Sequence, residues 1–134
     1  MPNTIYFMFE SIGSNYWGTY IYNPNYCRPL VIQAPHARRD ANTGLQGLHI
    51  FMESEGLFYQ VNGTHRCNSS GFSSCTGTTT SCSSVSEAYR ISDLAHTTQS
   101  LFQKTTEVLL NAFEDSHFIP VSYTHLTLPT ILLV

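Results

Sequence analysis

Two runs near the start of the chain have the aromatic and β-branched character of strands. Thr4–Glu10 and Trp17–Asn23 are rich in the residue types that favour extended, half-buried backbone. Gly13–Asn15 lies between them and suits a turn, and Asn23-Pro24-Asn25 ends the second run. The pattern predicts an antiparallel hairpin.

The next part of the chain changes from strand to helix periodicity and back again. Leu30–Ala34 is a short apolar run, typical of a strand that is buried on both faces. Leu57–Val61 is a second strand candidate. A helix is predicted between them from Thr43, with Gly56 as its C-cap and with an apolar face of Leu45, Leu48, Ile50, Phe51 and Met52. These elements predict a βαβ unit with parallel strands and a right-handed crossover.

A long polar loop and a second helix follow. Asn62 to about Glu87 is dominated by Ser, Thr and Gly, and a loop of that length is usually functional or stapled. Gln99–Phe113 has helical periodicity, and His117–Pro120 has the character of a further strand. The inward face predicted for the helix consists of Leu101, Phe102, Thr105, Val108, Leu109 and Ala112. The fold class expected is therefore α/β: an N-terminal antiparallel hairpin leading into a mixed, largely parallel sheet with flanking helices, truncated at the C-terminus.

The end of the chain has a different character. Val121–Thr130 resembles, over ten consecutive residues, the in-frame translation of a transposase mosaic-end sequencing adapter, and Ile131–Val134 continues that translation. Such segments are set aside in reasoning about a fold. We therefore expect a single incomplete α/β domain over 1–120 and an artefactual tail over 121–134.

Composition and charge exclude two classes of partner. A chain of 134 residues with 42% hydrophobic and 13% aromatic residues can build the core of one domain. A net charge of −3 with 11% charged residues gives no basic face for nucleic acid. The sequence has no apolar run of about 18 residues, so it gives no indication of a membrane span.

The cysteines indicate an oxidising compartment. Cys67, Cys75 and Cys82 lie in the polar loop without the C-x-x-C pairs of zinc sites, and Cys27 lies apart from them. We expect a secreted protein with at least one disulfide between two of the loop cysteines; four cysteines allow three complete pairings. Scarce Lys agrees with secretion, and Asn62-Gly-Thr and Asn68-Ser-Ser match glycosylation acceptor motifs.

The first group of candidate functional residues is on the loop after the buried strand. His36 and Asp40 lie between that strand and the helix at Thr43, at the edge where open α/β sheets bind ligands. An imidazole and a carboxylate four residues apart on one loop can bind a divalent metal. The alternative is that His36 forms an ordinary hydrogen bond within the loop, while Asp40 or Thr43 caps the helix.

The second group follows the next strand, at the same edge. Arg66 is a candidate to hold a substrate carboxylate with two hydrogen bonds, and His65 is a candidate to ligate metal or move a proton. The alternative is a surface turn whose Arg pairs with an acid of the loop.

The third group precedes the second helix. Ser92 or Asp93 is a candidate helix cap, and His96 a candidate supporting residue. Asp93 could also orient a histidine without touching the metal itself. The alternative for His96 is an exposed side chain with no role.

The order of these features resembles the beginning of the zinc carboxypeptidase-like superfamily, to which N-formylglutamate amidohydrolases and poly-γ-glutamate hydrolases belong. The resemblance covers Trp17 to Gln103 and is carried by the hairpin, the buried strand and Pro35-His36 followed by Asp40 and Thr43. It implies zinc, with His36 and Asp40 as first ligands. The spacing is one residue longer than the H-x-x-E of the carboxypeptidases, and Asp replaces Glu. A third ligand His and a catalytic Glu are expected beyond Pro120.

We therefore expect a fragment of a secreted, metal-dependent amidohydrolase or carboxypeptidase-like hydrolase, inactive as it stands. Its metal ligands would be His36, Asp40 and His65. Arg66 would anchor the carboxylate of a peptide or small-molecule substrate, and His96 would assist. The alternative is a disulfide-stapled extracellular binding domain without catalysis, whose polar loop recognises glycan or protein.

Overall fold

The N-terminal hairpin forms as predicted. The computed structural model describes residues 4–9 and 18–121. Strands β1 (Tyr6–Phe9) and β2 (Thr19–Tyr22) pair antiparallel, with Phe7 opposite Ile21. The turn predicted at Gly13–Asn15 lies outside the described residues, and so does the tail from residue 122 onwards.

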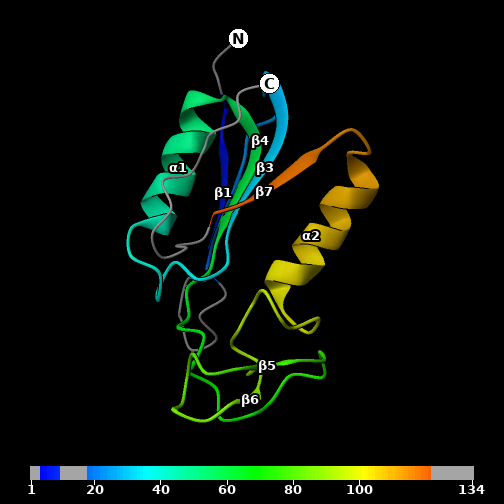
Figure 1. Cartoon of the computed structure of the whole chain (residues 1–134). Coiled ribbons are helices and arrows are strands. Elements are labelled where there is room, and N and C mark those ends of the chain that lie inside the picture. Colours follow the sequence, from blue (N-terminus) through cyan, green and yellow to red (C-terminus); the bar gives the residue numbers. More distant parts are fainter. Residues whose placement is uncertain (1–3, 10–17, 122–134) are drawn as a thin grey trace.

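The predicted βαβ unit forms the centre of the sheet. Strand β3 (Arg28–Ala34) and strand β4 (Gly56–Val61) are parallel, and helix α1 (Thr43–Glu53) connects them. Strand β7 (His117–Pro120) pairs parallel with the other side of β3, and β2 pairs antiparallel with β4. The sheet order is therefore β1-β2-β4-β3-β7, which confirms a mixed α/β sheet (Figure 1).

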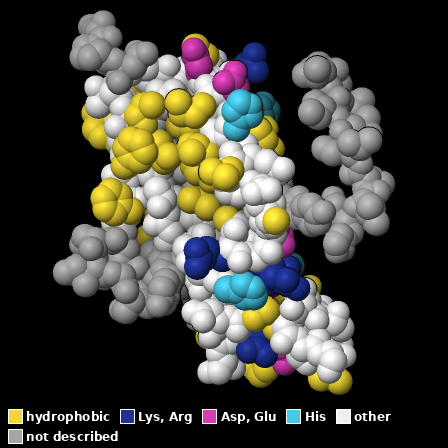
Figure 2. Space-filling model, turned by 90° about the vertical axis from the view of Figure 1, so that its left-hand side faces the viewer, with side chains coloured by type: hydrophobic (Ala, Val, Ile, Leu, Met, Phe, Trp, Pro, Cys, Tyr) yellow, Lys and Arg dark blue, Asp and Glu magenta, His cyan; other side chains and the backbone are white. Residues whose placement is uncertain are grey.

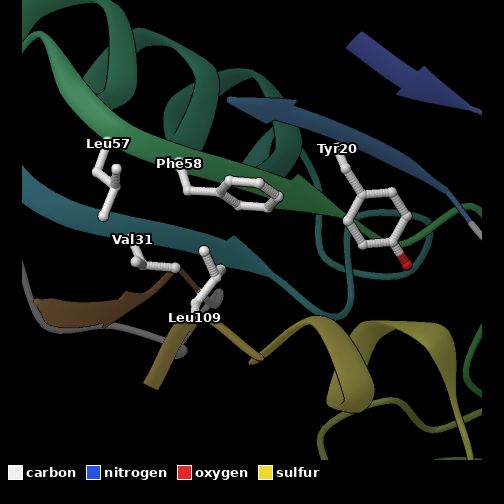
Figure 3. Packing of buried hydrophobic residues seen from close by; sticks show 5 residues of the cluster. All are labelled: Tyr20, Val31, Leu57, Phe58 and Leu109. Atoms are coloured by element: carbon white, nitrogen blue, oxygen red, sulfur yellow. The ribbon is translucent and has the colours of Figure 1, made fainter. Parts of the chain in front are cut away.

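The two helices lie on opposite faces of this sheet, and each covers its own part of the core (Figure 1). On the side of helix α2 (Leu101–Ala112), the buried side chains gather as shown in Figure 3: Tyr20, Val31, Leu57, Phe58 and Leu109. On the side of α1, a second group consists of Ile21, Ile32, Ala34, Phe51 and Tyr59. Successive strand residues point to opposite faces, so neighbours such as Val31 and Ile32 can belong to different groups.

The inward face of α1 differs from the predicted one. Thr43, Gly47 and Phe51 are its buried residues, whereas Leu45 is 69% exposed. The reason is close packing, because a Cβ atom on Gly47 would lie only 2.9 Å from the ring of Tyr59. The helix thus approaches the sheet closely at Gly47 and inserts Phe51 into the core, while other hydrophobic side chains remain exposed on this side of the molecule, as Figure 2 shows.

The prediction that Gly56 forms the C-cap of α1 is also wrong. Ser54 is the C-cap, and Glu55 takes the left-handed conformation with φ 49°. Gly56 is instead the first residue of β4, where it is buried. The chain therefore reverses direction one residue earlier than the glycine suggested.

Helix α2 is capped by a different residue from the two predicted. The Ser100 side chain accepts a hydrogen bond from the backbone N–H of Gln103 at 3.1 Å, so neither Ser92 nor Asp93 caps the helix. Phe102 and Leu109 are buried as predicted. Leu101 and Thr105 of the predicted inward face are half-buried, and Leu101 packs against the core, whereas Val108 and Ala112 are exposed.

The polar loop is stapled, as predicted. A disulfide joins Cys67 to Cys82, and the short strands β5 (Thr78–Thr79) and β6 (Glu87–Ala88) pair antiparallel below the main sheet (Figure 1). Between Asn62 and Ser100 the structure buries one large apolar side chain, Leu94. The loop is therefore held by its disulfide and polar contacts more than by a core.

Within the described ranges, no helix is both long and apolar enough to cross a membrane.

We predict that Gly47→Ala destabilises the protein, although Ala is the better helix former. Overpacking a rigid core costs about 1–3 kcal/mol, and helix propensity returns about 1 kcal/mol, so a net loss of about 1 kcal/mol is expected. The Tyr59 ring has little freedom to move, because its hydroxyl donates to the Gly44 carbonyl at 2.6 Å. Urea denaturation measures the effect. Gln46→Ala, on the exposed side of the same helix, is the control and should change little.

Candidate functional site

Three loops meet beyond the carboxyl ends of β3 and β4. His36 comes from the loop after β3, Arg66 from the loop after β4, and Asp93 from the segment that precedes α2. The parallel pairing of the two strands brings the first two loops side by side, and the stapled loop returns Asp93 to the same point. The predicted ligand-binding edge is therefore where polar side chains gather.

Asp93 is the centre of this group. Its side chain is 1% exposed, and both carboxylate oxygens are used. Oδ1 lies 2.8 Å from Nε2 of His36. Oδ2 accepts a hydrogen bond from Nε of Arg66 at 3.2 Å and forms an ion pair with Nη2 of the same side chain at 3.1 Å. Burying a carboxylate requires partners of this kind.

These partners keep Asp93 ionised. Burial by itself would raise the pKa of its carboxyl group. The hydrogen bond from His36 and the positive charges of His36 and Arg66 outweigh burial, so the pKa of Asp93 is lowered. Asp93 therefore acts as a fixed negative charge around which the loops are arranged.

The contacts of His36 determine which of its ring nitrogens is available. Nε2 is close to both Asp93 Oδ1 and Arg66 Nη2, at 2.8 and 2.9 Å, and cannot donate and accept together. Since a carboxylate only accepts, the arrangement that satisfies Asp93 puts a hydrogen on Nε2. Nδ1 then faces Oδ2 of Asp40 across 3.7 Å. A proton on Nδ1, or a cation held by both groups, would complement that carboxylate.

Two further buried side chains hold the loops in place. Asn62 donates from Nδ2 to the Pro35 carbonyl at 2.7 Å and joins the loops after β3 and β4. Ser92 donates to the Arg66 carbonyl at 2.7 Å and accepts from the backbone N–H of Ser69 at 2.9 Å. Sequence reasoning assigned no such role to Asn62 and treated Ser92 only as a helix cap. Their order along the chain gives no signal of these long-range contacts.

The structure brings together some of the predicted site residues and not others. His36 and Asp40 are adjacent, as predicted. His65 instead turns towards its own loop, where Nδ1 accepts from the backbone N–H of Cys67 at 3.2 Å. Over residues 4–9 and 18–121, no group of three or more His, Cys, Asp or Glu side chains could hold a metal ion. The set of His36, Asp40 and His65 is thus not assembled there.

Arg66 follows the alternative interpretation given above, in which it pairs with an acidic residue and does not anchor a substrate. It pairs with an acid of the loop, Asp93, and this pair is largely buried instead of lying on a surface turn. Its Nε donates to Asp93, and its Nη2 lies between Asp93 Oδ2 and His36 Nε2, so this edge of the guanidinium is directed inward and not towards a substrate carboxylate.

His96 lies beside the cluster and stacks on Tyr89. The two rings are nearly parallel, with centroids 3.7 Å apart. Burial lowers the pKa of His96. The carboxylate of Asp93 opposes that shift, and the positive charges of His36 and Arg66 add to it. A neutral imidazole in a ring stack fits a packing role. The backbone N–H of His96 donates a hydrogen bond to the backbone carbonyl of Asp93 at 2.8 Å, which closes a turn and supports the position of Asp93.

We predict that Asp93→Asn strongly destabilises the fold. Removing one charge of a buried pair leaves Arg66 without its counter-charge, which typically costs about 3–5 kcal/mol. Urea denaturation should show the loss. The matched control is Glu107→Gln, which breaks the exposed pair with Lys104 and should have little effect. Similar small effects in both variants would contradict the central role of Asp93.

We also predict that acid destabilises the protein in two steps. The lowered pKa of His96 means that the unfolded chain takes up its proton first, so stability falls as pH drops below about 6.5. The lowered pKa of Asp93 adds stability that is present above about pH 4 and is lost as pH falls through the folded-state value. Urea midpoints across this range measure both steps. His96→Phe, which keeps the ring stack, should remove only the upper step.

Comparison with known proteins gave no match to a family model, to a curated protein or to a solved structure.

Proposed function

We propose that the chain is part of a metal-dependent amide hydrolase of the zinc carboxypeptidase-like kind, in which His36 and Asp40 supply two metal ligands. The observation that supports the proposal is the hydrogen bond between Asp93 and His36. With Nε2 hydrogen-bonded to Asp93 at 2.8 Å, Nδ1 is the ring nitrogen that faces Asp40, and in the neutral ring it would present a lone pair to a metal ion bound there. Metal-bound histidines commonly have such a carboxylate behind them, which fixes the tautomer and orients the ring.

The donors that the structure describes fit zinc only in part. Zinc–nitrogen and zinc–oxygen bonds are about 2.0–2.2 Å, so donor atoms 3.7 Å apart can bind one ion between them. A catalytic zinc usually has three protein ligands, and His65 does not reach this pair in the present arrangement. The proposal is therefore a two-ligand half-site, and we expect it to bind zinc weakly.

In this proposal each residue of the cluster has a definite task. A bound zinc would polarise the amide carbonyl and lower the pKa of a water molecule. Asp93 holds His36 in the correct tautomer, and Arg66 keeps Asp93 ionised, so both are positioning residues. The substrate is a peptide or small molecule bearing a carboxylate, and its anchor would have to be a group other than the inward-facing edge of the Arg66 guanidinium.

A second candidate function is supported by a different observation. The Cys67–Cys82 disulfide staples an exposed loop rich in Ser and Thr, which is suited to binding glycan or protein outside the cell. In that case the cluster around Asp93 would only anchor the loop to the sheet, and no metal would be needed.

We predict weak zinc binding by the wild-type chain in calorimetric titration, and its loss in Asp40→Asn. This variant removes a charged ligand and leaves the His36–Asp93–Arg66 contacts in place. His36→Ala should lose binding too. The control is His49→Ala, which removes an exposed histidine on α1 and should bind zinc like the wild type.

The same titration separates the two functions. Equal zinc affinity of wild type and Asp40→Asn would mean that Asp40 is not a ligand and would contradict the two-ligand half-site on which the hydrolase proposal depends. The binding-domain candidate predicts instead that recognition of an immobilised oligosaccharide or protein partner depends on the staple. Cys67→Ser with Cys82→Ser should then abolish capture, while Asp40→Asn should not.

A further inference from the structure

Two glycosylation acceptor motifs lie close together at the start of the stapled loop. They are Asn62-Gly63-Thr64 and Asn68-Ser69-Ser70, and the sequence alone does not distinguish them. The structure gives their asparagines very different surroundings. One is part of the buried framework beneath the loop, and the other is on the surface.

Asn62 has no room for a sugar in the folded chain. It is 2% exposed, and both ends of its amide are used. Nδ2 donates to the Pro35 carbonyl at 2.7 Å, and Oδ1 accepts from the backbone N–H of Thr64 at 2.8 Å. A glycan on Nδ2 would need the space that the neighbouring loop fills and would break the contact between the loops after β3 and β4.

Asn68 is exposed and lies next to the disulfide at Cys67. Its backbone is fixed by a hydrogen bond from its N–H to the His65 carbonyl at 2.9 Å, so the side chain is displayed from an ordered turn. Nδ2 makes one exposed contact, to Thr64 Oγ1 at 3.3 Å. A glycosylated amide keeps one N–H, so this contact is compatible with the modification. Ser70, which completes the motif, is also exposed.

We propose that Asn68 is a site of N-linked glycosylation and that Asn62 is not modified in the folded protein. The donor is a lipid-pyrophosphate-linked oligosaccharide. Asparagine Nδ2 forms a bond to C1 of the first sugar while the bond from C1 to the pyrophosphate oxygen breaks. The lipid pyrophosphate leaves, the amide proton passes to a base of the transferase, and nothing is oxidised or reduced.

The disulfide is an independent observation that indicates the compartment in which N-linked glycans are transferred. Disulfides persist in the oxidising secretory route, where this transfer also takes place. Both asparagines are accessible before folding, but only a chain without a sugar on Asn62 can bury that side chain. Folding therefore excludes molecules with a sugar on Asn62, whereas the exposed Asn68 can carry a glycan without disturbing the fold. This inference does not depend on the metal site, because no residue of the His36–Asp40 pair takes part.

The test is expression of the full chain behind a cleavable secretion signal in a eukaryotic cell. Peptide mapping after peptide N-glycosidase treatment in heavy-oxygen water marks each asparagine that carried a glycan. We expect the mark at Asn68 in the secreted, disulfide-bonded protein. Asn68→Gln and Ser70→Ala should each abolish the mark and the gel shift.

Two control variants separate the motifs. Thr64→Val destroys the acceptor motif of Asn62 and should leave the shift intact, and Ser69→Ala keeps the motif of Asn68 and should do the same. Protein that is retained in microsomes is mapped in the same way, so a failure of secretion does not prevent the measurement. An unmodified Asn68 in either fraction, or a glycan on Asn62 in folded and protease-resistant protein, would overturn the proposal.

Discussion

The buried carboxylate of Asp93 is the point on which the arrangement of the loops depends. It is surrounded by His36 and Arg66, which come from the ends of two parallel strands, and it lies on a segment that returns from the stapled loop. An ionised carboxylate with 1% exposure is tolerated only if its partners replace the water it has lost. Without Asp93, the loops at the carboxyl edge of the sheet would lose the charge that draws His36 and Arg66 together, and the hydrogen bonds of Asn62 and Ser92 would remain to connect them.

The same contact connects structure to chemistry. By occupying Nε2 of His36, Asp93 leaves Nδ1 as the side of the ring that faces Asp40. One carboxylate thus determines what a second carboxylate and a histidine can do together. The geometry of the His36–Asp40 pair therefore depends on Asp93, which is distant in the sequence and orients the His36 ring. Arg66 in turn holds Asp93 in place through their ion pair.

How much the sequence could predict depended on the range of the interaction. Strand and helix periodicity located the hairpin, the βαβ unit and β7, because hydrophobic alternation is a local property. It misassigned the inward face of α1, where Gly47 packs against Tyr59 and a glycine carries no hydrophobic signal. His36 and Asp40 could be paired because they are four residues apart. The decisive partner of His36 is 57 residues away, which no spacing rule reaches. Asp93 was recognised as a possible orienting group, but its partner was not identified.

The stapled loop has a consequence for how the protein responds to temperature. Between Asn62 and Ser100 it buries only Leu94 among large apolar side chains, whereas the sheet and helices contain the two apolar clusters. The heat-capacity change of unfolding follows the apolar surface that becomes exposed. Opening of the loop therefore contributes little to it, and the curvature of stability with temperature is set almost entirely by the sheet and its two helices. Low apolar burial also allows such a segment to open locally while the core remains folded, so its amide hydrogens exchange with solvent at a lower free-energy cost than those of the central strands.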